Sequence, residues 1–444
     1  KAAAGQAITG KTAGFDRQQG RDIVQSGAAE HGDSGNCQIR REDCYYRAVA
    51  AAIASETIMP TSPARLLERI RRLIATPSVS SVSPQFDQSN RPVIDLLADW
   101  LESAGFVVRI EPLPERPDKA NLIATLGSGP GGLVLAGHTD TVPFDAGRWR
   151  FDPFGGIEAD ERIYGLGTAD MKAFLALALD AAQEFQASDL RQPLIILATA
   201  DEESSMAGAR ALAAAKQPLG RHALIGEPTG LKPVRMHKGI LMEAIRLEGR
   251  SGHSSNPALG VNALEGMHQV MGELLHWRTE LQTHYRNPLF AVETPTLNLG
   301  HIHGGDNPNR ICADCELHID LRPLPGMLLA SLREELHGRL ARLMADSGLI
   351  LNFLPLFAGI EAMETPATAA IVQATEQLTG AQARAVSFGT EGPYLNALGM
   401  ETVILGPGSV ECAHQPDEFL PLATIPPTLD LLRGLIGRFC VQPA

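Results

Sequence analysis

The sequence predicts an α/β protein, in which helices flank a mostly parallel sheet and a smaller α+β domain is inserted into the chain. Short apolar runs alternate with helical patterns in both the first and the last part of the sequence. Between them, from about Lys238, strands of mixed polarity surround two long helical patterns. Strand–helix alternation is typical of a parallel sheet covered by helices. A chain of 444 residues also exceeds what one hydrophobic core usually serves, which favours two domains.

The first part of the chain differs from the rest. Residues 1–60 are polar and rich in Gly, Ala and Gln, without a sustained period. They lack the apolar segment of a signal peptide, and the sequence does not begin with Met. We expect residues 1–60 to be an extension that is poorly ordered or an artefact.

Folding signals begin at "TSPARLLERIRRLI", where Thr61 suits a helix N-cap and Pro63 suits the first turn. A second helical pattern, "RPVIDLLADWLESAGF", is followed by apolar runs such as "GGLVLAGHTD" and "PLIILATADEE" that alternate with helices. We assign residues 61–237 to the first part of the large domain. The same alternation of apolar runs and helical patterns returns in residues 359–444, which supply the second part of the large domain.

The intervening residues 238–358 have a different pattern. "KGILMEAIRLEG" reads as a strand, a long helix is expected at about residues 262–283, and "TLNLGHIHGG" and "CELHIDLRP" read as further strands before a second helix. Two helices with several alternating strands indicate a compact α+β domain. We therefore expect it to be inserted into the large domain.

Composition excludes several classes of partner and site. The net charge of −13 argues against a nucleic-acid partner, which would require a basic face. No apolar run approaches the ~18 residues of a membrane span, and six cysteines are too sparse for a disulfide framework. We therefore expect a protein of the reducing cytoplasm without a membrane partner. The lone "CADC" at 312–315 reads as strand residues rather than a metal site.

Polar residues follow several apolar strands. "PLIILATADEESSMAG" ends a buried run in three acids, Asp201, Glu202 and Glu203, although adjacent like charges repel. Four further polar clusters follow apolar runs or enter a helix, and they contain His138 with Asp140, Asp170, Glu227 and His414. In open α/β sheets, ligands bind at the carboxyl ends of the strands. These side chains are therefore expected at one edge of the sheet.

Imidazoles and carboxylates at one edge indicate a divalent metal site, because this mixture suits Zn²⁺ or a similar first-row ion. The five expected ligands are enough for two ions if one carboxylate bridges them: His138, Asp170, Glu203, Glu227 and His414. Cations would also offset the repulsion among the acids. Each residue alone has a structural explanation; Asp170, for example, could be a helix-capping acid. The coincidence of five clusters at one edge favours the metal site.

The motifs "GHTDTVPF", "GLGTADMKAF", "ATADEESSMAGA", "SGHSSNPALGVNA" and "GPGSVECAHQPDE" resemble those of the dinuclear zinc amidohydrolases. This family includes deacetylases of acetylornithine, succinyl-diaminopimelate desuccinylase, aminoacylases and carboxypeptidase G. The resemblance runs from about Pro60 to Cys440 and implies a zinc-exopeptidase-like catalytic domain with an inserted lid or dimerisation domain. It also implies a homodimer that binds two divalent ions, Zn²⁺ or alternatively Co²⁺.

The resemblance also implies residue roles. His138 and Glu227 would bind one ion, Glu203 and His414 the other, and Asp170 would bridge them. Glu202 matches the general base, and Asp140 matches the acid that orients His138. Three residues match positions that contact substrate: His253, which in dimeric relatives comes from the partner subunit, Asn309 and Arg322. Ala173 departs from the family, many members of which have Gly there.

The implied reaction is hydrolysis of the amide of N2-acetyl-L-ornithine, in arginine biosynthesis, by a metal-bridging water that Glu202 activates. N-acetylcitrulline, other N-acyl amino acids and dipeptides are alternative substrates, because the strand-end ligands do not discriminate among them. A metal-free binding protein on the same fold is a further alternative, which the complete ligand set disfavours. "GLGTAD" lacks the spacing of a dinucleotide-binding loop.

Overall fold

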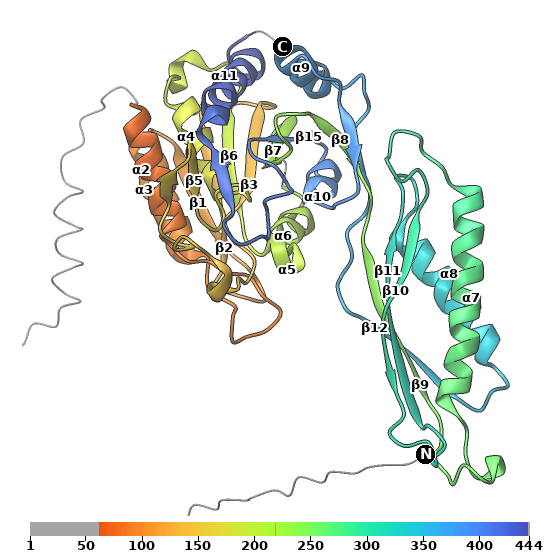
Figure 1. Ribbon diagram of the computed structural model, residues 1–444. Coiled ribbons are helices and arrows are strands. Elements are labelled where there is room, and N and C mark those ends of the chain that lie inside the picture. Colours follow the sequence, from red (N-terminus) through yellow and green to blue (C-terminus); the bar gives the residue numbers. More distant parts are fainter. Residues whose placement is uncertain (1–61, 218, 443–444) are drawn as a thin grey trace, which may run out of the picture. The chain divides into compact units, whose positions relative to one another are not determined.

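The computed structural model describes residues 62–217 and 219–442, so the expectation for residues 1–60 lies outside the described part of the chain. The described residues form a nine-stranded sheet, a separate four-stranded antiparallel sheet and a small three-stranded sheet (Figure 1). The two larger sheets have separate hydrophobic cores. The predicted fold class, an α/β sheet with an inserted α+β unit, is confirmed.

The large sheet has the strand order β1-β2-β6-β3-β7-β15-β8-β13, with β14 also paired to β8. Its centre, β6-β3-β7-β15, is parallel, whereas β1, β2 and β13 join by antiparallel pairing. The parallel centre directs four carboxyl ends to one edge. The strand bounds are β1 Val107–Pro112, β2 Ala120–Leu126, β3 Leu133–His138, β6 Leu194–Thr199, β7 His222–Pro228, β8 Val234–His237, β13 Met363–Glu364, β14 Arg384–Val386 and β15 Glu401–Gly406.

Helices cover both faces of this sheet, because its central strands are apolar on both sides. In β3, Leu133 and Leu135 belong to one core, while Val134 and Ala136 belong to the core on the other face. This alternation follows from the two-residue period of a strand. The helices of the large sheet are α2 Pro63–Ile74, α3 Arg91–Ser103, α4 Lys172–Ala182, α5 Glu202–Ser205, α6 Ala207–Ala215, α9 Ala370–Thr379, α10 Gly392–Ala397 and α11 Ile425–Ile436.

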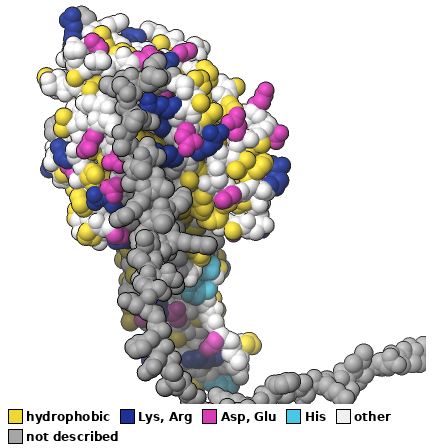
Figure 2. All heavy atoms as spheres, turned by 90° about the vertical axis from the view of Figure 1, so that its left-hand side faces the viewer, with side chains coloured by type: hydrophobic (Ala, Val, Ile, Leu, Met, Phe, Trp, Pro, Cys, Tyr) yellow, Lys and Arg dark blue, Asp and Glu magenta, His cyan; other side chains and the backbone are white. Residues whose placement is uncertain are grey.

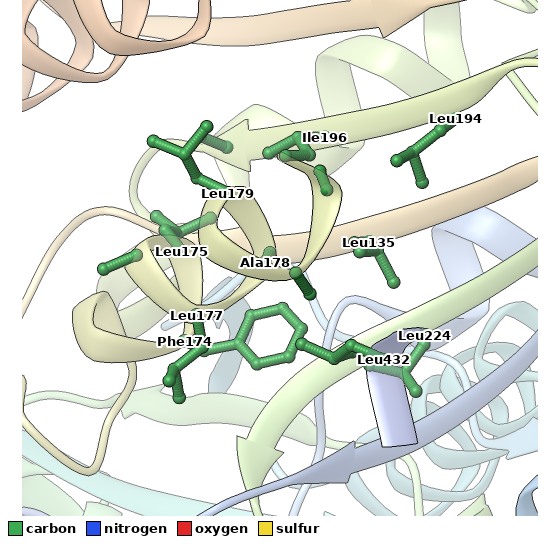
Figure 3. Close-up of a cluster of buried hydrophobic side chains, with 14 of the residues drawn as sticks. Leu135, Phe174, Leu175, Leu177, Ala178, Leu179, Leu194, Ile196, Leu224 and Leu432 are labelled. Atoms are coloured by element: carbon green, nitrogen blue, oxygen red, sulfur yellow. The ribbon is translucent and has the colours of Figure 1, made fainter. Parts of the chain in front are cut away.

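Helix α4 lies inside the larger core, and all eleven of its residues are buried. Phe174 and Leu175 of α4 pack with Leu135 of β3, Ile196 of β6 and Leu432 of α11 (Figure 3). Apart from Lys172 and Asp180 the helix is apolar on all sides, which is typical of such a buried position. The loop that enters α4 carries Asp170, so core packing fixes the helix that follows this residue.

The four-stranded sheet has the order β10-β11-β9-β12 and is antiparallel throughout. The helix expected at about residues 262–283 is α7, and both helices of this unit contribute to its core. The elements are β9 Leu241–Glu248, α7 Ala263–His284, β10 Thr296–Gly304, β11 Asp314–Arg322, α8 Leu329–Met344 and β12 Ile350–Pro355. The chain leaves the large sheet after β8 and re-enters it at β13, so the unit is an insertion.

The three-stranded sheet joins distant segments of the large unit. It consists of β4 Ile157–Ala159, β5 Arg162–Tyr164 and β16 Phe419–Pro421, and β16 pairs with β5. On the face shown in Figure 2, acidic and basic side chains are interspersed with hydrophobic ones. Among the described residues, no helix combines the length and the apolar character needed to cross a membrane.

Candidate metal centre

The parallel centre of the large sheet places the expected ligands at one edge. His138 is the last residue of β3, Glu227 lies near the end of β7, and Glu202 and Glu203 begin α5 directly after β6. Asp170 precedes α4, and His414 lies in the loop between β15 and β16. Since parallel strands end at a common edge, these distant segments meet there.

Two groups of three side chains have ligand atoms that lie within 4.8 Å of one another: His138, Asp170 and Glu227, and Asp170, Glu203 and His414. In the first group, His138 Nε2 lies 3.0 Å from Asp170 Oδ1 and 4.0 Å from Glu227 Oε1. In the second, His414 Nε2 lies 3.0 Å from Glu203 Oε1 and 3.3 Å from Asp170 Oδ2. Asp170 thus offers one oxygen to each histidine.

The backbone of Asp140 sets which nitrogen of His138 faces the acids. His138 Nδ1 lies 3.0 Å from the carbonyl oxygen of Asp140, which can only accept, so Nδ1 carries a hydrogen. Nε2 is therefore the nitrogen that faces Asp170 and Glu227. The resemblance assigned the orienting role to the side chain of Asp140, but its Oδ1 lies 3.8 Å from Nδ1.

The carboxylate of Asp140 instead accepts hydrogen bonds from the first turn of α5. Its two oxygens accept the backbone N–H groups of Glu202 at 3.2 Å and of Glu203 at 3.0 Å. A carboxylate at a helix N-terminus satisfies N–H groups that have no partner within the helix. Asp140 therefore ties the end of β3 to the acids that follow β6.

A second network fixes the residue at which β6 turns into α5. Asp201 has a left-handed backbone conformation, with φ 56°, and its carboxylate accepts from Ser80 Oγ at 2.8 Å and from the buried ammonium of Lys119. Lys119 also donates to Asp87 at 2.7 Å. Asp201, the first of the three adjacent acids after β6, thus has a cationic side chain as partner, which was not foreseen from the sequence.

Burial and mutual repulsion shift the pKa values of these groups. Burial, with the charges of neighbouring acids, raises the pKa of Glu202 and Glu227 well above the usual range and raises that of Glu203. Burial would raise the pKa of Asp170, but hydrogen bonds to His138 and His414 lower it. Hydrogen bonds to Asp170 and Glu203 raise the pKa of His414 to about 10. The acids can therefore share the site as carboxylates only if cationic groups compensate them; otherwise some of them take up protons.

One further buried acid was missed by the sequence analysis. Glu391, the residue before α10, accepts from Thr199 Oγ1 at 2.8 Å, and its other oxygen is buried without a hydrogen-bond partner among the described residues. Burial raises its pKa to about 7, and the charges of His138 and Asp140 also act on it. Like Asp170, it lies before a helix, but the short strand β14 that precedes it is not an apolar run in the sequence.

The three predicted substrate residues lie on the four-stranded unit. His253 and Arg310 form a β-bridge, and the N–H of Ser254 donates to the carbonyl of Asn309 at 3.1 Å, so His253 and Asn309 are close. Arg322 lies at the other end of β11, where its Nε donates to Asp320. Within the described residues, no hydrogen bond or ion pair connects any of the three to the metal-ligand groups.

The donor atoms fit divalent cations. Each group offers one imidazole and two carboxylates, a set that suits Zn²⁺ and similar borderline ions. The side chains are buried apart from His414, which is half exposed, so most of these donors have little water to solvate their charge. A cation would stabilise the ionised carboxylates, reverse the burial-driven rise of their pKa values and remove the mutual repulsion.

Comparison with known proteins supports the described fold. The sequence profile of peptidase family M20/M25/M40 matches residues 134–438, which include every ligand candidate. The chain belongs to peptidase family M20/M25/M40. Within this M20 chain, the match covers the segments from β3 to α11, including the four-stranded insertion.

The M20 chain is similar to several curated bacterial proteins. It is 52% identical over 375 residues to the acetylornithine deacetylase of Proteus mirabilis, covering 84% of this chain and 97% of that protein. It is 54% identical over 370 residues to the acetylornithine deacetylase of Edwardsiella ictaluri, with coverage of 83% and 96%. The similarity therefore spans nearly the full length of these relatives.

Solved structures share the M20 fold at low sequence identity. A tripeptidase from Staphylococcus aureus superposes with a TM-score of 0.68 at 19% identity, covering 86% of this chain and 99% of that one. The aminopeptidase PepT of Bacillus cereus gives a TM-score of 0.65 at 19% identity, with coverage of 85% and 99%. At this identity the likeness concerns the fold alone.

Proposed function

We propose that this M20 chain is a metal-dependent amidohydrolase that cleaves N2-acetyl-L-ornithine to acetate and L-ornithine. The observation that carries the proposal is the pair of donor groups that share Asp170 beside the buried Glu202. The substrate is suggested by relatives named acetylornithine deacetylase at 49–54% identity over 83–85% of the chain.

In this proposal the site holds two divalent ions, Zn²⁺ or alternatively Co²⁺. His138 and Glu227 would hold one, Glu203 and His414 the other, and Asp170 would contribute one oxygen to each. When bound, such ions supply Lewis-acid polarisation of the scissile carbonyl and acidify water. The fixed Nδ1–H of His138 keeps its Nε2 available as a ligand, and a hydrogen bond of this kind is usual behind metal-binding histidines.

Glu202 is the group best placed to move the proton. Its carboxyl group is buried beside the two donor groups but belongs to neither, so it is not needed as a metal ligand. We propose that Glu202 takes a proton from the attacking water and passes it to the leaving nitrogen. Asp140 holds the backbone of Glu202 in position for this transfer.

The remaining expectations belong to the same proposal. His253, Asn309 and Arg322 would contact substrate, and the inserted unit, expected at residues 238–358 between catalytic segments 61–237 and 359–444, would act as a lid or dimerisation domain. We propose a cytoplasmic homodimer that acts in arginine biosynthesis. His253 would reach a substrate oxygen of the partner subunit's site, as the resemblance implies.

A substrate panel tests the proposal. Purified full-length protein is assayed with N2-acetyl-L-ornithine, N-acetyl-L-citrulline and N-acetyl-L-methionine, each with and without a chelator. We expect acetylornithine to give the highest kcat/KM and the chelator to abolish turnover. A preference for acetylcitrulline would reassign the substrate, and turnover that survives removal of all metal would refute metal dependence.

A further inference from the structure

Glu418 is a buried acid whose side chain holds the loop that carries Asp170. Its Oε1 accepts the backbone N–H groups of Gly167 at 3.1 Å, Ala169 at 2.8 Å and Asp170 at 3.0 Å. Its carbonyl oxygen also accepts the N–H of Gly165 at 2.9 Å. Glu418 therefore accepts four hydrogen bonds from the backbone of residues 165–170 and fixes its conformation.

The Asp170 loop needs such an acceptor. Glu418 itself is 1% exposed, so little water is available to the N–H groups that it accepts. Buried N–H groups without an acceptor are costly, by about 1–3 kcal/mol each. The loop is also closely packed, because Gly167 has φ +85° and a Cβ there would lie 2.9 Å from Lys172 Cδ. It therefore has little freedom to find other partners.

Glu418 also belongs to the segment that supplies His414. Between them, Asp417 accepts the backbone N–H of Arg150 at 2.8 Å and pairs with the guanidinium of Arg150 at 2.7 Å. Directly after Glu418, β16 pairs with β5, the strand that leads into the Asp170 loop. The half-exposed His414 therefore lies on a segment that is anchored on its C-terminal side.

We propose that Glu418 is a positioning residue for the metal centre, which clamps the Asp170 loop to the His414 segment so that Asp170 can face both histidines. This inference rests on the proposed metal site. Among the described residues, Glu418 makes no hydrogen bond to the side chain of a candidate ligand; it acts through the backbone of Asp170. Residues that orient metal ligands typically contribute 10–100-fold to metal affinity.

The experiment measures metal binding directly. Metal-free full-length protein is titrated with Co²⁺ against a competing chromophoric chelator, and bound ions are counted by elemental analysis. We expect Glu418→Met, which removes the acceptor at similar size, to bind Co²⁺ about 10–100-fold more weakly than the wild type. Glu418→Gln retains a carbonyl oxygen for the three N–H groups and should stay close to the wild type.

The matched control is Glu411→Met, which removes an exposed acid from the same segment and should leave Co²⁺ affinity unchanged. If Glu418→Met does not fold, Glu418→Asp replaces it, because its shorter side chain withdraws the carboxylate from the N–H groups. Wild-type affinity in that variant or in Glu418→Met overturns the clamp, as does an equal loss in Glu418→Gln. A wild type that binds no Co²⁺ would instead refute the proposed metal site itself.

Discussion

Glu202 and Glu203 are adjacent, yet their side chains have different surroundings. They begin helix α5, in which consecutive residues point about 100° apart. Glu203 contacts His414 at 3.0 Å, whereas Glu202 is buried among the charges of His138, Glu227 and Glu391. A ligand and a proton carrier can therefore be neighbours in the chain.

The different roles proposed for Glu202 and Glu203 predict the behaviour of Glu202→Gln. The substitution keeps the size of the side chain but removes its proton-accepting carboxylate, so we expect kcat to fall by about 10²–10⁴-fold, the usual contribution of a general base. Metal content should stay at the wild-type level because Glu202 belongs to neither ligand group. Turnover and elemental analysis on the same preparation check both parts. Normal turnover would remove Glu202 from the reaction.

At the scale of elements, the contact between β7 and α4 positions two ligands. Gly226 of β7 lies under the ring of Phe174, and a Cβ on Gly226 would come within 2.1 Å of Phe174 Cγ. Glu227 is the next residue of β7, and α4 follows Asp170. The absence of a side chain at Gly226 therefore lets strand and helix approach closely beneath the site.

We predict opposite effects for two Gly→Ala substitutions. Gly226→Ala overpacks the core and should lower the free energy of unfolding by about 1–3 kcal/mol. Gly272→Ala, in helix α7, meets no atom within 4 Å and should raise it by about 0.5–1 kcal/mol through helix propensity. Urea unfolding measures both. A Gly226→Ala protein as stable as the wild type would contradict the close packing.

The sequence predicted elements well where local pattern and burial agree. The helix expected at residues 262–283 is Ala263–His284, and the apolar runs before His138 and Glu202 are strands β3 and β6. The turn into α5 was not predictable, because the left-handed conformation of Asp201 is held by Lys119 and Ser80 from distant segments. Such contacts have no signal in the local sequence.

At the scale of the whole molecule, the site concentrates buried acids that destabilise one another without cations. Saturating metal should therefore stabilise the folded protein. At a metal concentration of about 100 times Kd, binding at one site adds about 2.7 kcal/mol to the free energy of unfolding. Thermal unfolding with chelator and with added Zn²⁺ or Co²⁺ measures the difference. His414→Ala should reduce the metal-dependent rise in Tm. Identical Tm values for the wild type with and without metal would contradict stabilisation by metal.

The position of the site was predictable from strand ends, whereas its supporting residues were not. His138, Asp170, Glu203, Glu227 and His414 all lie at or after apolar strands, or before a helix, and the structure brings them into two groups. Glu391 precedes helix α10 and Glu418 lies in the same segment as His414, but only tertiary contacts reveal Thr199 and the Asp170 loop as their partners. Whether the predicted ligands bind metal stays a prediction.

The order of the ligands along the chain matters for synthesis. His138, Asp170 and Glu227 leave the ribosome within one stretch of the polypeptide, but His414 follows only after the whole four-stranded unit has been made. A nascent chain that has not reached His414 also lacks Glu418, so the Asp170 loop, which serves both donor groups, is not yet held. A truncated product that ends before His414 would lack one ligand of the second group and the proposed clamp on Asp170, so both donor groups would be affected.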